Sequence, residues 1–164
     1  MTDMRRENVV VVQILSDSRS LPVVRGAVEQ MAASEGLKPA DSHGLILAID
    51  EALANVIKHG YGGQTDQPIT ITLSSVEADD GRRGIAIEVR DRARQVDPGS
   101  ICGRNLDDVR PGGLGVHIIR AVMDEAEYSC PEEGGMCLRM VKYVSNASQR
   151  DAGDEASESQ QPMQ

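Results

Sequence analysis

The chain has 164 residues, 40% of them apolar, so it is long enough to form one domain with a real buried core. It has no Phe or Trp and a net charge of −9, so neither aromatic stacking nor attraction to a phosphate backbone favours nucleic acid as a partner. No apolar run approaches the ~20 residues of a membrane span and the N-terminus lacks an apolar signal core, which predicts a cytoplasmic protein without membrane contact.

The N-terminal part predicts one strand followed by two helices. Residues 8–15 are short and β-branched, which is typical of a strand. Residues 21–35 have apolar side chains at helical spacing, and Gly36 ends that helix. A second helix is predicted to begin near Pro39 and to run to about residue 59.

The second predicted helix has a polar stripe of distinctive composition. At about 100° per residue, Glu51, Asn55 and His59 recur every four positions on one face, and Lys58 lies beside them. Small residues separate these side chains and leave room for a ligand, namely Ala48, Ala52 and Ala54. On residue types alone, an ordinary helix with a solvated polar stripe and a glycine-rich end remains an alternative interpretation.

Two further strands and a long loop follow. Residues 68–76 and 84–90 alternate apolar and polar side chains and are predicted to form a hairpin. From Asp91 to Gly115 the chain is rich in Gly, Pro, Arg and Asp, and a loop of about 25 residues inside a compact domain is usually functional. An apolar helix begins at Val116, so the preceding glycines can bring backbone N–H groups to a phosphate, although such turns also occur without a ligand.

The C-terminal part predicts a last hairpin, with strands at residues 126–130 and 136–144. Cys130 and Cys137 could face each other across it. Because the three cysteines lack metal-ligand spacing and are odd in number, the sequence predicts neither a disulfide framework nor a zinc site. Small buried thiols are therefore expected instead.

Three motifs occur in a fixed order along the chain. Glu51 and Asn55 share a helix, Asp91 ends a strand, and a Gly-Gly-Leu-Gly turn opens the third helix at residues 112–115. Their order and spacing resemble the nucleotide-binding boxes of the GHKL ATPases, and within them the anti-sigma-factor serine kinases of bacterial stress and sporulation control. The flanking segments are also similar, namely His59-Gly60-Tyr61, Asp97-Pro98 and Met123-Asp124-Glu125-Ala126-Glu127-Tyr128.

The resemblance covers roughly residues 9–144 and implies a fold. It is an α/β two-layer sandwich, in which a mixed, mostly antiparallel sheet is covered on one face by about three helices. The nucleotide is then expected between a helix and the sheet.

The resemblance also implies roles that the chemistry of the residues supports. Asn55 resembles the Mg²⁺ ligand, since a neutral carboxamide oxygen can join phosphate oxygens without repelling the triphosphate of ATP. Glu51 resembles the catalytic base that polarises the attacking hydroxyl. Asp91 resembles the carboxylate that accepts a hydrogen bond from the amino group of adenine.

Further contacts with ATP are implied around these three residues. Residues 100–111 would form a lid, with Arg104 and Arg110 as contacts of phosphate or of a partner protein. An exposed lysine at a helix end is an alternative interpretation of Lys58. The remaining expected contacts are His59, Ala93, Gly112, Gly113, Leu114 and Gly115.

Ala93 departs from the family pattern, which usually has glycine two residues after the aspartate. Its Cβ would lie where backbone usually approaches the base. The alanine would also require a different turn if the glycine had a positive φ.

Two functions follow from the resemblance. The first is a serine/threonine kinase that binds a sigma factor and phosphorylates an anti-sigma factor antagonist of the STAS type, as a homodimer. The second is a non-catalytic ATP-binding regulatory module of the same fold. The presence of Glu51 favours the first, whereas a general phosphate-binding or purely structural domain is a third interpretation that depends on Ala93.

The sequence divides into an N-terminal arm (1–7), one ATPase domain (8–144) and an acidic tail (145–164). The tail has almost no large apolar side chain, so it cannot bury enough surface to offset its chain entropy and is expected to be disordered. Truncation after Ser145 should therefore leave the melting temperature and the affinity for ATP unchanged. Calorimetry checks both, and a melting temperature lowered by several degrees would show that the tail packs on the domain.

Overall fold

The structure, a computed structural model, describes residues 5–93 and 113–145. Its elements follow the predicted order. The N-terminal part contains β1 (Arg5–Leu15), η1 (Ser18–Ser20), α1 (Leu21–Ser34), α2 (Pro39–Asn55) and the π-helix η2 (Val56–Gly60). The remaining elements are β2 (Pro68–Glu77), β3 (Arg83–Arg90), α4 (Gly113–Val122), β4 (Glu125–Ser129) and β5 (Cys137–Tyr143).

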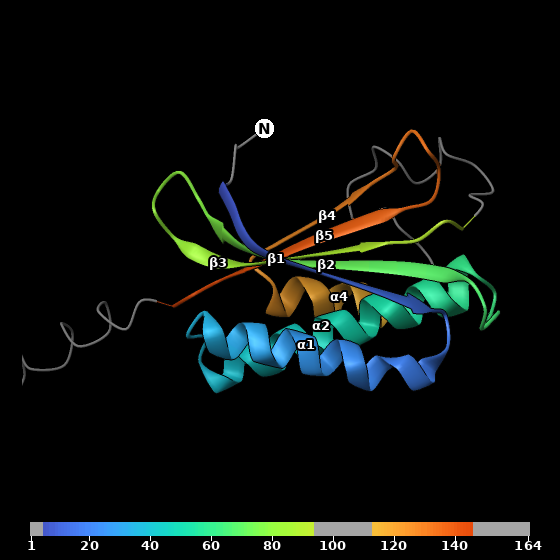
Figure 1. Cartoon of the computed structure of the whole chain (residues 1–164), viewed down its shortest axis with the longest axis horizontal. Helices are drawn as coiled ribbons and strands as arrows, with labels where there is room; N and C mark the ends of the chain where they lie inside the picture. The colour runs from blue at the N-terminus through green and yellow to red at the C-terminus, as the bar shows by residue number, and fades with distance from the viewer. Residues whose placement is uncertain (1–4, 94–112, 146–164) are drawn as a thin grey trace, which may run out of the picture.

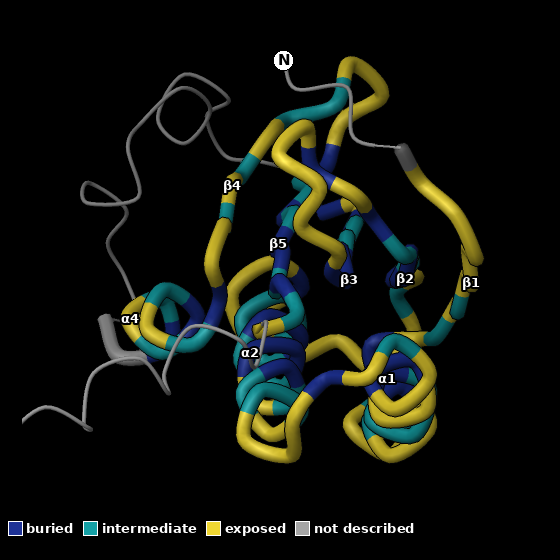
Figure 2. The backbone as a smooth tube through the Cα atoms, turned by 90° about the vertical axis from the view of Figure 1, so that its left-hand side faces the viewer, coloured by how far each residue is buried: buried dark blue, intermediate teal, exposed yellow. Residues whose placement is uncertain are grey.

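The described strands form one five-stranded sheet in the order β1-β2-β3-β5-β4, and every neighbouring pair is antiparallel. The three described α-helices cover one face of this sheet (Figure 1). In the view turned by 90°, α2 lies between α1 and α4 (Figure 2), and it packs against both. The predicted two-layer sandwich with helices on one face is confirmed, and where a mixed, mostly antiparallel sheet was predicted, the described strands pair only antiparallel.

The main core lies between the sheet and the helices because strand residues alternate between the two faces. On β2 and β3 the fully buried residues that face the helices recur at every second position, namely Ile69, Ile71, Leu73, Ile85, Ile87 and Val89. On α2 they recur every four residues, as Leu45, Ile49 and Leu53. Burial of each of these side chains contributes on the order of 1.5–3 kcal/mol. A smaller cluster contains Val76, Ala78, Ala86, Val141 and Tyr143.

Glycines allow α2 and α4 to approach closely. A Cβ on Gly44, near the start of α2, would lie 3.3 Å from the Cβ of Val122 at the end of α4. A Cβ on Gly115, near the start of α4, would lie 2.6 Å from Oε2 of Glu51. The two helices therefore run in opposite directions, and α4 begins against the C-terminal half of α2.

The α-helix that was predicted to run to about residue 59 ends earlier. α2 stops at Asn55, and Val56–Gly60 form a π-helix in which the N–H of Tyr61 donates to the carbonyl of Val56 at 2.9 Å. A π turn contains more residues than an α turn. The four-residue spacing of the polar stripe therefore holds from Glu51 to Asn55 but does not continue at the same geometry to His59.

The expectation for the cysteines was correct only in part. Cys137 is a free, half-buried thiol, and burial raises its pKa. Cys130, in contrast, is disulfide-bonded, so the prediction of a free thiol there was wrong.

Some predicted features lie outside the described residues. These are the first four residues of the arm, the lid at residues 100–111 with Arg104 and Arg110, Gly112, and the tail from residue 146. Within residues 5–93 and 113–145, no helix is both long and apolar enough to cross a membrane.

Candidate functional site

Asp91 follows the last residue of β3, and only 5% of its surface is exposed. Alternation along the strand places it on the same face as Val89, which is the face that the helices cover. Its Oδ1 accepts the backbone N–H groups of Ala93 at 2.9 Å and Met136 at 3.1 Å. Burial raises the pKa of the Asp91 carboxyl, while these two N–H groups oppose the rise. One oxygen is thus held by the backbone, and neither of these bonds uses Oδ2.

The turn between β4 and β5 holds the backbone at Asp91. The N–H of Asp91 donates to the carbonyl of Met136 at 3.0 Å. Gly135 has a φ of 79°, and a Cβ on it would lie 2.1 Å from the carbonyl oxygen of Asp91, so this position requires glycine. The sequence predicts this hairpin but not its contact with Asp91. The available signal was the pair Gly134-Gly135.

Tyr61 is a second residue near Asp91, and its place in the site is not predicted by the sequence motifs. Its hydroxyl donates to the carbonyl of Pro68 at 2.6 Å and accepts the N–H of Arg92 at 2.7 Å. The side chain is buried, and this burial raises the pKa of the phenol, so the hydroxyl keeps its proton at neutral pH. The sequence shows this tyrosine only as the last residue of the flanking segment His59-Gly60-Tyr61, which does not reveal that it follows a π-helix.

Ala93 fits its position without backbone strain. Among the described non-glycine residues only Asn8 has a positive φ, so the turn after Asp91 does not require a left-handed residue at position 93. The side chain of Ala93 is buried in the main core. A Cβ on Gly60 would lie 3.4 Å from the Cβ of Ala93 and 3.8 Å from Oδ2 of Asp91. The absence of a side chain at Gly60 therefore leaves space beside both residues.

Glu51, Asn55 and Gly115 meet where α4 begins against α2. Glu51 and Asn55 are both half-buried and lie about one turn apart. A Cβ on Gly115 would lie 2.6 Å from Oε2 of Glu51 and 3.5 Å from Nδ2 of Asn55. Any larger residue at position 115 would displace the Glu51 carboxylate. The positive end of the α4 dipole lies at this contact, which favours a bound anion.

The other predicted site residues lie in η2, at the start of α4 or outside the described residues. Lys58 and His59 lie in η2 with exposed side chains, and within the described part of the chain they form no hydrogen bond or ion pair with Glu51 or Asn55. Gly113 and Leu114 are the first residues of α4, whereas Arg110 and Gly112 lie outside the described residues. Next to Glu51, Asp50 has a structural contact instead, because it pairs with Arg25 of α1 at 2.8 Å.

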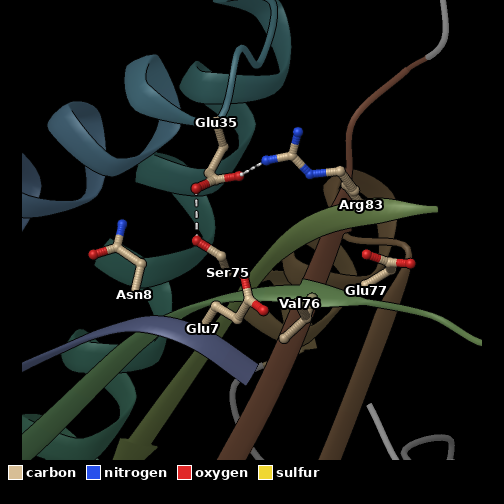
Figure 3. Close-up of a pocket in the computed structure, with 7 residues that line it drawn as sticks. All are labelled: Glu7, Asn8, Glu35, Ser75, Val76, Glu77 and Arg83. Carbon is tan, nitrogen blue, oxygen red and sulfur yellow. Dashed lines mark hydrogen bonds and ion pairs between the residues drawn. The ribbon is translucent and has the colours of Figure 1, made fainter. Parts of the chain in front are cut away.

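A separate pocket lies between β1, β2 and the end of α1 (Figure 3), lined by Glu7, Asn8, Glu35, Ser75, Val76, Glu77 and Arg83. Glu35 accepts hydrogen bonds from the Ser75 hydroxyl at 2.6 Å and from the Arg83 guanidinium at 2.8 Å. Three carboxylates and one paired guanidinium do not favour a phosphate group. Glu35 instead ties the end of α1 to the sheet.

These features define a class of protein. One helix-and-sheet sandwich contains a half-buried Glu/Asn pair on a helix, a buried aspartate at a strand end and a glycine at the start of another helix. ATPase domains of the GHKL type have the same combination. Residues 14–142 match the family described as the histidine kinase-like ATPase domain. The chain belongs to this family.

Among individual proteins, the chain is similar to the serine-protein kinase RsbW from two bacteria. It is 24% identical to RsbW of Listeria monocytogenes over 140 residues, which cover 83% of this chain and 87% of that protein. It is 22% identical to RsbW of Staphylococcus aureus over 157 residues, which cover 91% and 95% of the two chains. The resemblance to the anti-sigma-factor serine kinases is thus confirmed.

Two solved structures share the fold. The structure of the RsbU and RsbW domains of Rv1364c from Mycobacterium tuberculosis matches with a TM-score of 0.57 and 19% identity, over 85% of this chain and 33% of that one. The SiaB–SiaC complex from Pseudomonas aeruginosa matches with a TM-score of 0.60 and 16% identity, over 80% and 88%. At these identities the matches establish the fold alone.

Proposed function

We propose that this chain binds Mg·ATP between α2, α4 and the sheet and transfers the γ-phosphoryl group to a serine or threonine of an anti-sigma factor antagonist. The observation that carries the proposal is the contact of Gly115 with Glu51 and Asn55, which joins two of the three sequence motifs. The third motif, Asp91, is buried on the helix-covered face of the same sheet. Family membership supports this interpretation.

Each side chain would have one task in the bound complex. Oδ2 of Asp91 would accept a hydrogen bond from the adenine amino group while Oδ1 stays on the backbone. Asn55 would offer its carboxamide oxygen to Mg²⁺. Among the described residues no three His, Cys, Asp or Glu side chains are grouped to hold a metal, so the other ligands would be phosphate oxygens and water.

Glu51 would act as the base for the attacking hydroxyl. In the part of the chain that the structure describes, its carboxylate forms no hydrogen bond or ion pair, which leaves it available to a substrate. Bound Mg²⁺ would supply neutralisation of the phosphate charge. Proton acceptance and orientation of the hydroxyl would then fall to Glu51.

The proposed partners rest on the similar proteins and on the exposed side chains of β1. The relatives RsbW are serine-protein kinases by name, which supports a protein substrate. A sigma factor as the second partner, a homodimer and a cytoplasmic location complete the proposal. The edge strand β1 has exposed apolar side chains that favour contact with a second copy, namely Val9, Val11 and Leu15.

Asp91→Asn tests the adenine contact. The amide oxygen can still accept the two backbone N–H groups, but the group at the Oδ2 position becomes a donor facing another donor. We expect the affinity for ATP to fall by about 10- to 100-fold, because a charge-assisted hydrogen bond is lost. Titration calorimetry measures this. Asp80→Asn is the control, since Asp80 also accepts a backbone N–H but lies in an exposed turn.

The same variant should not lose stability at neutral pH. Because the pKa of Asp91 is raised in the folded state, ionisation of this carboxyl opposes folding. Its stabilising contribution is present below about pH 4, near its unfolded pKa, and is lost as the pH rises through the folded pKa. Asp91→Asn should therefore melt at or above the wild-type temperature at pH 7.

Two results would contradict the proposed site. Unchanged ATP affinity in Asp91→Asn would remove Asp91 from the site, and wild-type protein that gives no heat with Mg·ATP at millimolar concentration would refute nucleotide binding.

A further inference from the structure

The ends of β2 and β3 lie beside Asp91, and their pairing stops there. The register pairs Thr70 with Arg90. Continued by two residues on each strand, this register places Pro68 opposite Arg92. Because proline has no N–H, only one ladder bond is available at that position, from the N–H of Arg92 to the carbonyl of Pro68.

The hydroxyl of Tyr61 occupies this bond. It donates to the carbonyl of Pro68 at 2.6 Å and accepts the N–H of Arg92 at 2.7 Å, so an oxygen atom lies between the two ladder partners. A hydroxyl that donates to a carbonyl is also a stronger acceptor, which makes the bridge cooperative. The two strands are thus held apart at the residue that follows Asp91.

We propose that Tyr61 is a positioning and specificity-determining residue, whose hydroxyl separates the ends of β2 and β3 and so orients the Asp91 carboxylate toward adenine. The inference depends on the proposed binding of ATP. Three successive N–H groups fix this segment: those of Asp91, Arg92 and Ala93 bind Met136, Tyr61 and Asp91 respectively. Of these bonds, the one to Tyr61 alone links the segment to the end of α2 through η2.

Tyr61→Phe tests the proposal because it keeps the ring and removes only the bridge. Without the hydroxyl, the N–H of Arg92 either pairs directly with the carbonyl of Pro68 or loses its partner. Direct pairing would draw the two strand ends together, and loss of the partner would release the segment, so either outcome would change the position of Asp91. We expect the affinity for Mg·ATP to fall by roughly tenfold, and the affinity for Mg·GTP to change by less than about threefold. The ratio of the affinity for Mg·ATP to the affinity for Mg·GTP should therefore fall.

Tyr143→Phe is the matched control. Tyr143 is also buried, and its hydroxyl donates to Glu125 at 2.6 Å, but it belongs to the smaller apolar cluster away from Asp91. Both variants lose one buried hydroxyl, so a merely structural role predicts the same nucleotide affinities for both. Calorimetry with ATP and GTP should be performed where circular dichroism shows all variants folded. A folded Tyr61→Phe protein with wild-type affinity and preference would overturn the inference while leaving ATP binding intact.

A second measurement does not require the Tyr61→Phe protein to fold. The chain has only three tyrosines, so 3-fluorotyrosine gives three ¹⁹F resonances, which Tyr128→Phe and Tyr143→Phe assign by elimination. Saturating Mg·ATP should shift the Tyr61 resonance and leave that of Tyr143 in place. A Tyr61 resonance that does not move while calorimetry shows ATP bound would refute the coupling. Wild-type protein that binds no ATP would instead refute the proposed function, and with it this inference.

Discussion

The Glu51→Gln variant is expected to bind Mg·ATP like the wild-type protein and to transfer phosphate roughly 10²–10⁴-fold more slowly. Glutamine keeps the length and shape of the half-buried side chain, so the contact with Gly115 can remain. It cannot accept a proton from the attacking hydroxyl, and it orients that hydroxyl less well than a carboxylate does. Binding and turnover should therefore separate in this variant.

The assay requires the protein substrate, because a switch kinase without its antagonist is expected to hydrolyse ATP very slowly. With radiolabelled ATP and antagonist proteins from the same cell, wild-type protein should label a serine or threonine, and Glu51→Gln should give almost no label. Glu29→Gln, an exposed glutamate of α1, controls for the loss of one charge on a helix.

Two outcomes would contradict this assignment. Equal labelling by wild type and Glu51→Gln would show that Glu51 takes no part in the chemistry. A partner that forms a stable ATP-dependent complex but is never labelled would favour the non-catalytic module. In that case nucleotide binding would survive and the kinase activity would not.

The order of the elements was predictable because periodicity is a local property of sequence. The alternation predicted for β2 and β3 is confirmed on the face that the helices cover, although the middle of β3 is buried on both faces because Ala86 belongs to the smaller cluster. The meeting of Gly115 with Glu51 and Asn55 was implied by the family resemblance and agrees with the packing of α2 on α4. Glycines at the two ends of this helix pair make the close approach possible.

The supports of Asp91 were not predictable, because they depend on which strands are neighbours. The contact with Met136 requires β5 beside β3, and the bridge through Tyr61 requires the register of β2 on β3. Neither is contained in local periodicity. The π-helix was missed for a related reason, since glycines indicate where a helix ends but not the geometry of its last turn.

Ala93 is a departure from the family motif that the backbone of this chain accommodates without a positive φ. From the sequence, an alanine in place of glycine suggested a left-handed backbone or an intrusion on the base. In the structure, position 93 does not have a positive φ, and Gly60 leaves room beside its Cβ. A bulky residue at position 60 would lie against both Ala93 and Asp91, so the two small residues act as a pair.

Asn55→Ala is expected to remove the effect of magnesium on ATP binding. Wild-type affinity should rise as Mg²⁺ is added, whereas the affinity of the variant should stay near the metal-free value, because the carboxamide that would hold the ion is gone. Phosphate transfer should fall by roughly 10²-fold or more, since several kcal/mol of charge stabilisation at the phosphoryl oxygens depend on the metal. Gln30→Ala, which removes an exposed carboxamide from α1, is the control and should keep the magnesium effect.

The comparison of Asn55→Ala with Glu51→Gln separates the two roles on α2. The residues lie about one turn apart and both contact the position of Gly115, so a general distortion of α2 would affect binding equally in both variants. Loss of magnesium-dependent binding in Asn55→Ala alone assigns the metal to Asn55. If Asn55→Ala still binds ATP more tightly when Mg²⁺ is added, and to the same extent as wild type, the ion is held elsewhere and the proposed ligand is wrong.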